Sequence, residues 1–283
     1  EHIAYVMVRQ SKLLILAIAF LISGCLQEST SYHDLIIKLA DDDYLTRLAA
    51  SNNLTTIGVG VVPSIISFLE KQPYDGDSTF HQRWESVNVL GRIKDEQAVE
   101  ILADRVLNDK ESHVRWRSLW ALSQIKSNKT IDIFLRNLDN EDSSVRWNSA
   151  VALGYFNDNR SVPVLLEGLN SSSDWVKWEA VYTLGILKQK DTAYYIAKML
   201  DDSSERIRQE SCLTLGKIDN KAAVEGLINS LADESSEVRW RAAKALADIK
   251  AEDSYENIKE ALQRETDEIA IENMRKSIES LKS

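Results

Sequence analysis

Histidines, cysteines and paired carboxylates are the side chains of this 283-residue chain that could do chemistry. The four histidines are His2, His33, His81 and His113, and none stands in a His-Glu pair or a metal-ligand spacing. The sequence has no Gly-rich phosphate loop and no Gly-x-Ser-x-Gly elbow. Acidic pairs such as Asp201-Asp202 stand where helix caps and solvated turns are expected. We therefore predict no catalytic residue, no metal site and no cofactor.

Cys25 has a context that suggests covalent chemistry of another kind. It follows an apolar run at residues 13–22, which is too short to span a bilayer, and the basic residues Arg9 and Lys12 precede that run. The sequence Leu21-Ile22-Ser23-Gly24-Cys25 resembles the lipobox of prokaryotic lipoproteins. The resemblance implies cleavage after Gly24 and a lipid on the Cys25 thiol. The alternative is a short buried helix that ends in cysteine.

This resemblance divides the chain into three parts. We expect residues 1–24 to be a lipoprotein signal peptide, with Glu1 or Met7 as the start, and residues 25–33 to be a polar tether. Residues 34–283 form the folded body. The expected location is the cell envelope, on the extracytoplasmic side of a prokaryotic membrane.

A repeat organises the folded body. Its basic residue recurs first after 32 residues and then after every 31, and a small residue follows eight positions later in each copy. The basic residues are Arg83, Arg115, Arg146, Lys177, Arg208 and Arg239. The small residues are Gly91, Ser123, Gly154, Gly185, Gly216 and Ala247. A fixed period of this length is typical of solenoids.

Each repeat predicts two helices with a polar turn between them. In the copy around Arg146, the first helix carries Ala152 and Leu153 at core positions, and a glycine near its end breaks it. An irregular loop is expected at residues 71–79, and Cys212 falls on a core position. We predict an all-α, right-handed α-solenoid of about seven helical pairs with capping helices at both ends.

These motifs also resemble a known family. Val145-Arg146-Trp147, Ala152-Leu153-Gly154 and residues 162–169 are similar to the HEAT-like repeats first described in phycobilisome lyases, and the resemblance covers about residues 41–263. It implies the solenoid fold. It says little about function, because scaffolds, enzyme subunits and designed binders share this repeat.

The basic residues form a ladder with two possible roles. Acidic or amide residues lie six positions before four of them and are expected to pair with them, namely Asp109, Asn140, Asp202 and Asp233. In this interpretation the ladder is structural. The alternative is a positive stripe for an acidic ligand.

Aromatic residues form a second row beside the predicted core. Five tryptophans directly follow a basic residue, and three further rings lie five or nine positions after one: the row is Trp84, Trp116, Trp120, Trp147, Tyr155, Trp178, Tyr182 and Trp240. The family resemblance implies that these positions line the concave face. We favour partner binding for the central six, whereas Trp84 and Trp240 fit equally well as rungs packed on arginine stems.

Charge and pattern together lead to the predicted function. A net charge of −10 argues against a nucleic-acid partner, because such binding depends on cationic contacts to phosphate. We expect a monomeric, lipid-anchored, non-enzymatic scaffold that binds a protein or peptide. The alternatives are a lyase, isomerase or assembly factor for a tetrapyrrole protein, and a structural spacer of the envelope.

Overall fold

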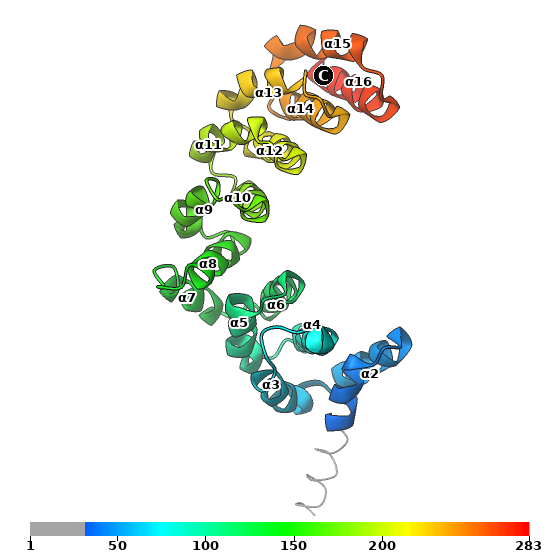
Figure 1. Cartoon of the computed structure of the whole chain (residues 1–283), viewed down its shortest axis with the longest axis vertical. Helices are drawn as coiled ribbons and strands as arrows, with labels where there is room; N and C mark the ends of the chain where they lie inside the picture. The colour runs from blue at the N-terminus through cyan, green and yellow to red at the C-terminus, as the bar shows by residue number, and fades with distance from the viewer. Residues whose placement is uncertain (1–31, 283) are drawn as a thin grey trace, which may run out of the picture. The chain divides into compact units, whose positions relative to one another are not determined.

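The structure is a computed structural model that describes residues 32–282 (Figure 1). These residues form a short helical stretch at 32–37 and the α-helices α2 to α16, joined by turns and short 3-10 helices, and they contain no strand. The predicted all-α solenoid is therefore confirmed. The chain divides into two compact units, Glu1–Thr130 and Ile131–Ser283. The predicted signal peptide and Cys25 lie outside the described residues.

The first unit begins with a helical stretch at residues 32–37, followed by the 3-10 helix Lys38–Ala40. Its α-helices are α2 (Tyr44–Ile57), α3 (Val62–Glu70), α4 (Asp77–Ile93), α5 (Val99–Asn108) and α6 (Ser112–Ile125). Helix α7 (Lys129–Arg136) begins at its end. Pro63 lies in the first turn of α3, where its fixed φ suits the start of a helix. The irregular loop is shorter than expected, because α4 begins at Asp77.

The second unit contains the most regular repeats. Its helices are α8 (Ser143–Tyr155), α9 (Val162–Gly168), α10 (Asp174–Leu187), α11 (Ala193–Ala197), α12 (Glu205–Ile218), α13 (Val224–Ser230), α14 (Ser236–Asp248), α15 (Tyr255–Arg264) and α16 (Glu268–Lys282). The first helices of the pairs pack on one another in succession, from α8 through α10, α12 and α14 to α16. Helices α9, α11 and α13 form a second layer beside them (Figure 1).

The core of the second unit repeats with the sequence. The same position of each first helix holds a fully buried leucine, and the same position of each second helix holds a fully buried leucine or isoleucine. These residues are Leu153, Leu184, Leu215 and Leu246, and Leu165, Ile196, Leu227 and Ile258. One helical pair cannot bury such a face alone, so neighbouring pairs share it. Cys212 is also fully buried, and burial raises the pKa of its thiol to about 12.

Stretch Tyr44–Glu70 is long and apolar enough, by length and composition alone, to cross a membrane. It does not form one straight helix, because Gly58 adopts a positive φ of 74° and ends α2, and α3 starts four residues later. Leu54 on α2 and Ile65 and Leu69 on α3 are fully buried. The stretch therefore packs as a helical pair of the solenoid.

The repeated glycine has a different role from the predicted one. Gly185 lies inside α10, and the helix ends two residues after it, at Lys188, which adopts a left-handed φ of 51°. A Cβ atom at Gly185 would lie 2.7 Å from Thr214 Oγ1 on α12, and one at Gly154 would overlap the side chain of Thr183 on α10. The prediction that these glycines break the helix was wrong. They allow adjacent first helices to approach closely.

Replacing this glycine tests the close approach. Gly185→Ala is expected to lower the free energy of unfolding by about 1–3 kcal/mol, since Thr214 must move, although alanine favours an unhindered helix. Urea unfolding of the full chain measures the change. Gly216→Ala is the graded control, because its Cβ atom would lie 3.2 Å from Ala245 Cα. A larger loss for Gly216→Ala would contradict the packing argument.

Candidate interaction surface

The ladder residue Arg208 joins the loops of two consecutive repeats. Its Nη1 donates to the main-chain oxygens of Asp202 and Ser203 at 3.1 and 3.3 Å, in the loop before its own helix. Its Nε and Nη2 donate to the carboxylate of Asp233, in the loop of the next repeat, at 2.8 and 3.0 Å. A guanidinium suits this role because its donors form a rigid fork.

The same arrangement recurs along the ladder. Carboxylate pairs join Arg83 to Asp109, Lys177 to Asp202 and Arg239 to Glu265, with shortest distances of 2.9, 2.6 and 2.7 Å. Arg115, Arg146 and Arg239 donate to main-chain oxygens six and five positions before them. The Arg83–Asp109 pair is completely buried. These cations are therefore occupied within the chain.

The prediction that each acid pairs with the basic residue six positions after it was wrong for the carboxylates. The basic residue six positions later donates a hydrogen bond to Asp109, Asp202 or Asp233 only at the main-chain oxygen. Their carboxylates bind the basic residue of the preceding repeat. The cause is local, because Asp233 Oδ1 also accepts from the main-chain N–H of Ser235 at 2.8 Å, which holds the carboxylate in a tight turn.

Two positions of the ladder lack an acid. Asn140 and Ser171 occupy the loop position that is aspartate in the copies at Asp109, Asp202 and Asp233. Within the second unit, Ser171 keeps only the turn function, since its hydroxyl accepts from the main-chain N–H of Ser173 at 3.1 Å. By its place in the repeat, residue 171 would supply the carboxylate partner of Arg146. In the described chain Arg146 makes only its two hydrogen bonds to main-chain oxygens.

We call the side of the first helices that carries the aromatic row the first-helix face. In the second unit, Trp147 on α8 donates its indole N–H to Glu179 on α10 at 2.7 Å. Its ring packs against the Gly168 position of α9. Glu179 is almost fully buried. Trp147 is thus a contact between repeats as well as part of the surface.

Three neighbouring rings on α10, which we call the aromatic ladder, form the largest aromatic cluster of this face in the second unit. Trp178 stacks on Tyr182, with ring centroids 5.3 Å apart and an interplanar angle of 16°. The ring centroid of Trp175 lies 5.3 Å from that of Trp178, and Trp175 is 37% exposed. The guanidinium of Arg206, on α12, lies 4.2 Å from the Trp178 centroid and 5.4 Å from that of Trp175. Burial raises the pKa of Tyr182.

The first unit contains a similar stack. The guanidinium of Arg117 on α6 lies 4.5 Å from the ring centroid of Trp84 on α4 and 5.0 Å from that of Trp120. The Trp120 ring also touches the Gly91 position, where a Cβ atom would lie 2.7 Å from it. Trp84 and Trp120 are half-buried.

The structure gathers the predicted row only in part. Trp116 and Trp120 belong to the first unit and the other central rings to the second. Tyr155 makes an edge contact with Phe156, and Trp240 stacks with Arg241 at 4.7 Å. The sequence prediction missed Trp175 and the arginines. Trp175 lies three residues before Trp178 on the same helix, and this spacing was a signal that it shares the face.

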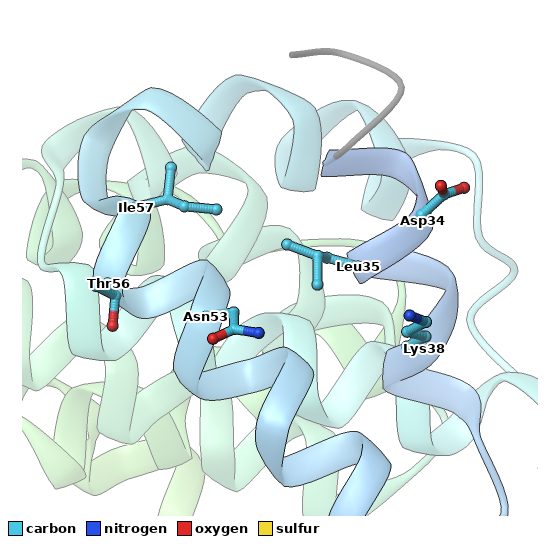
Figure 2. A pocket seen from close by; sticks show the side chains of 6 residues that line it. All are labelled: Asp34, Leu35, Lys38, Asn53, Thr56 and Ile57. Atoms are coloured by element: carbon cyan, nitrogen blue, oxygen red, sulfur yellow. The ribbon is translucent and has the colours of Figure 1, made fainter. Parts of the chain in front are cut away.

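Another candidate is a shallow groove of about 530 Å³ in the first unit (Figure 2). Asp34, Leu35 and Lys38 line one wall, and Asn53, Thr56 and Ile57 of α2 line the other. This lining offers one carboxylate and one ammonium group without a nucleophile activated by a base. In residues 32–282, no three His, Cys, Asp or Glu side chains gather as metal ligands would.

Paired helices, a shared apolar core and a polar ladder define an α-solenoid of helical repeats. The sequence matches HEAT repeats at residues 75–146, 135–211 and 195–279, which together span more than half of its length. The chain therefore belongs to the HEAT repeat family. No curated protein sequence matches the chain.

The chain is similar to several solved structures, and the first of them has the same fold. The Escherichia coli protein YibA is 20% identical, with a TM-score of 0.59, over 92% of this chain and 96% of that one. Human deoxyhypusine hydroxylase is 21% identical, with a TM-score of 0.39, over 92% and 98% of the two chains. The CpcE–CpcF complex of the Nostoc phycocyanin lyase is 17% identical, with a TM-score of 0.43, over 78% and 94%.

Restoring the missing acid tests the ladder. Ser171→Asp is expected to stabilise the chain by about 1 kcal/mol, because the new carboxylate keeps the turn and gains Arg146. The melting temperature should rise by about 2–4 °C. Thermal unfolding measures it, with the exposed neighbour change Ser172→Asp as the control. Equal shifts for both variants would show that the gain is not specific to the ladder position.

The last pair of the ladder predicts a pH dependence. Hydrogen bonds from Arg239 lower the pKa of Glu265 to about 2. Since the unfolded carboxyl titrates near about 4.3, the pair stabilises the fold fully above that value and loses its effect as the pH falls toward about 2.

Glu265→Gln isolates this contribution. Relative to the unaltered chain, the variant should lose about 2–3 kcal/mol of unfolding free energy near neutral pH, and the difference should shrink in acid. Urea titrations at several pH values measure it, and a difference independent of pH would refute the pairing.

Proposed function

We propose that this HEAT repeat protein is a monomeric, non-enzymatic scaffold that binds a protein or peptide on its first-helix face. The aromatic ladder of Trp175, Trp178 and Tyr182 is the observation that carries the proposal. Tryptophan and tyrosine supply much of the binding energy at protein interfaces, since they combine large apolar area with few rotatable bonds. A shared face of successive helices offers such rings to an extended partner.

The second part of the proposal is a lipid anchor on Cys25, in the cell envelope. Its support is the sequence from Leu21 to Cys25 with the apolar run before it. An anchored chain meets membrane neighbours at a high effective concentration, so modest affinity for the partner suffices. Mass spectrometry of the N-terminal peptide tests this part, and an unmodified Cys25 in the native protein would refute it.

A crosslinking pull-down from native membranes tests the binding surface. The full chain is compared with a Trp175→Ala, Trp178→Ala variant. Capture of the partner is expected to fall by about tenfold or more, in keeping with the loss of interface aromatics. Circular dichroism must first show equal thermal stability, since Trp178 also stacks on Tyr182.

The matched control is Tyr194→Ala with Tyr195→Ala. These two rings lie on α11 in the second layer and are 60% and 45% exposed. The control should capture the partner as the unaltered chain does. Equal capture by all three proteins would move the binding surface elsewhere, and no partner with any of them would favour an envelope spacer.

A further inference from the structure

Two arginines of the first-helix face differ from those of the ladder. In residues 32–282, four arginines have side chains without a hydrogen bond or an ion pair: Arg117, Arg136, Arg206 and Arg275. Only Arg117 and Arg206 among these four lie against aromatic rings. This chain carries 44 acidic residues against 34 basic ones, so partners for a cation are abundant.

The two arginines are held in the same way, one in each unit. Arg117 is placed between the rings of Trp84 and Trp120, and Arg206 lies against Trp178 and Trp175. Stacking on an indole restricts a long side chain without using its N–H donors. Each guanidinium is thus held in place before a ligand binds, and its N–H groups remain free to donate hydrogen bonds to that ligand.

Acidic groups of the same helix do not fill this role for Arg206. Glu205 accepts hydrogen bonds from Gln209 at 2.8 Å and from Ser235 at 2.6 Å. Glu210 lies 4.0 Å from Lys217. In residues 32–282 no carboxylate forms an ion pair with Arg206, so its guanidinium is free to bind a carboxylate of another molecule.

We propose that Arg206, and independently Arg117, bind carboxylates of an acidic peptide segment in the partner. The inference deepens the proposed function and rests on it. A guanidinium and a carboxylate match in a bidentate geometry, and the restricted side chain loses little entropy on binding. The exposed edge of Trp175 suits an apolar side chain next to the bound acid.

Charge complementarity also defines what the surface rejects. A net charge of −10 repels polyanions at long range. A peptide with single acidic residues among apolar ones places each carboxylate next to Arg206 or Arg117 only. A nucleic acid also places phosphates next to the acidic side chains of the surface, which repel them. The favoured occupant is accordingly a mixed acidic and apolar peptide.

A peptide array tests the inference without knowledge of the native partner. The fluorescently labelled full chain is applied to random short peptides, to phosphoserine-containing versions and, separately, to vesicles of phosphatidylglycerol. Bound peptides are expected to be enriched in Asp and Glu flanked by apolar residues. Arg206→Gln should weaken the binding of those peptides that dock on the second unit about tenfold or more, as the loss of a bidentate charged pair implies.

The control is Arg275→Gln, which removes an equally unpaired arginine that has no aromatic contact and should leave binding unchanged. Arg117→Gln gives the same test in the first unit. Bound peptides without acidic enrichment, binding that survives both Arg206→Gln and Arg117→Gln, or stronger binding to phosphoserine or vesicles would each overturn the inference. A native partner that Trp175→Ala, Trp178→Ala loses but Arg206→Gln and Arg117→Gln retain would refute this inference and leave the scaffold standing.

Discussion

The fork of hydrogen bonds from one basic residue to two loops sets the register of the stack. Apolar packing alone is non-directional and would tolerate a helical pair that slides or rotates on its neighbour. Arg208 removes this freedom, since its donors reach Asp202 and Ser203 in its own repeat and Asp233 in the next. The leucines of the core and the glycine contacts depend on that register.

The first-helix face combines structural contacts with the proposed partner binding in the same side chains. Trp147 is tied to Glu179 on the next helix, and Trp178 has one side against Tyr182 and the other toward Arg206. These contacts hold the rings in one conformation. A surface of ordered aromatic rings binds at lower entropic cost than a mobile one, so the two roles support each other.

The sequence predicted the fold well because its repeat is strict. The period of the basic residues located the helical pairs from Arg83 onward. It could not show the direction of the ion pairs, because Asp233 lies six residues from Arg239 and 25 from Arg208, and only the fold brings the distant partner close. The stacks around Arg117 and Arg206 were missed for the same reason, since each joins two helices.

The ladder has a consequence for how such a chain can change during evolution. Where a repeat carries both the donor and the acceptor of the ladder, as with Arg208 and Asp202, a whole 31-residue unit can be gained or lost while the remaining donor and acceptor still pair. A partial deletion would instead leave a group such as Asp109 charged and buried without Arg83, at a cost of several kcal/mol. The length of the chain can therefore change only in steps of one whole repeat.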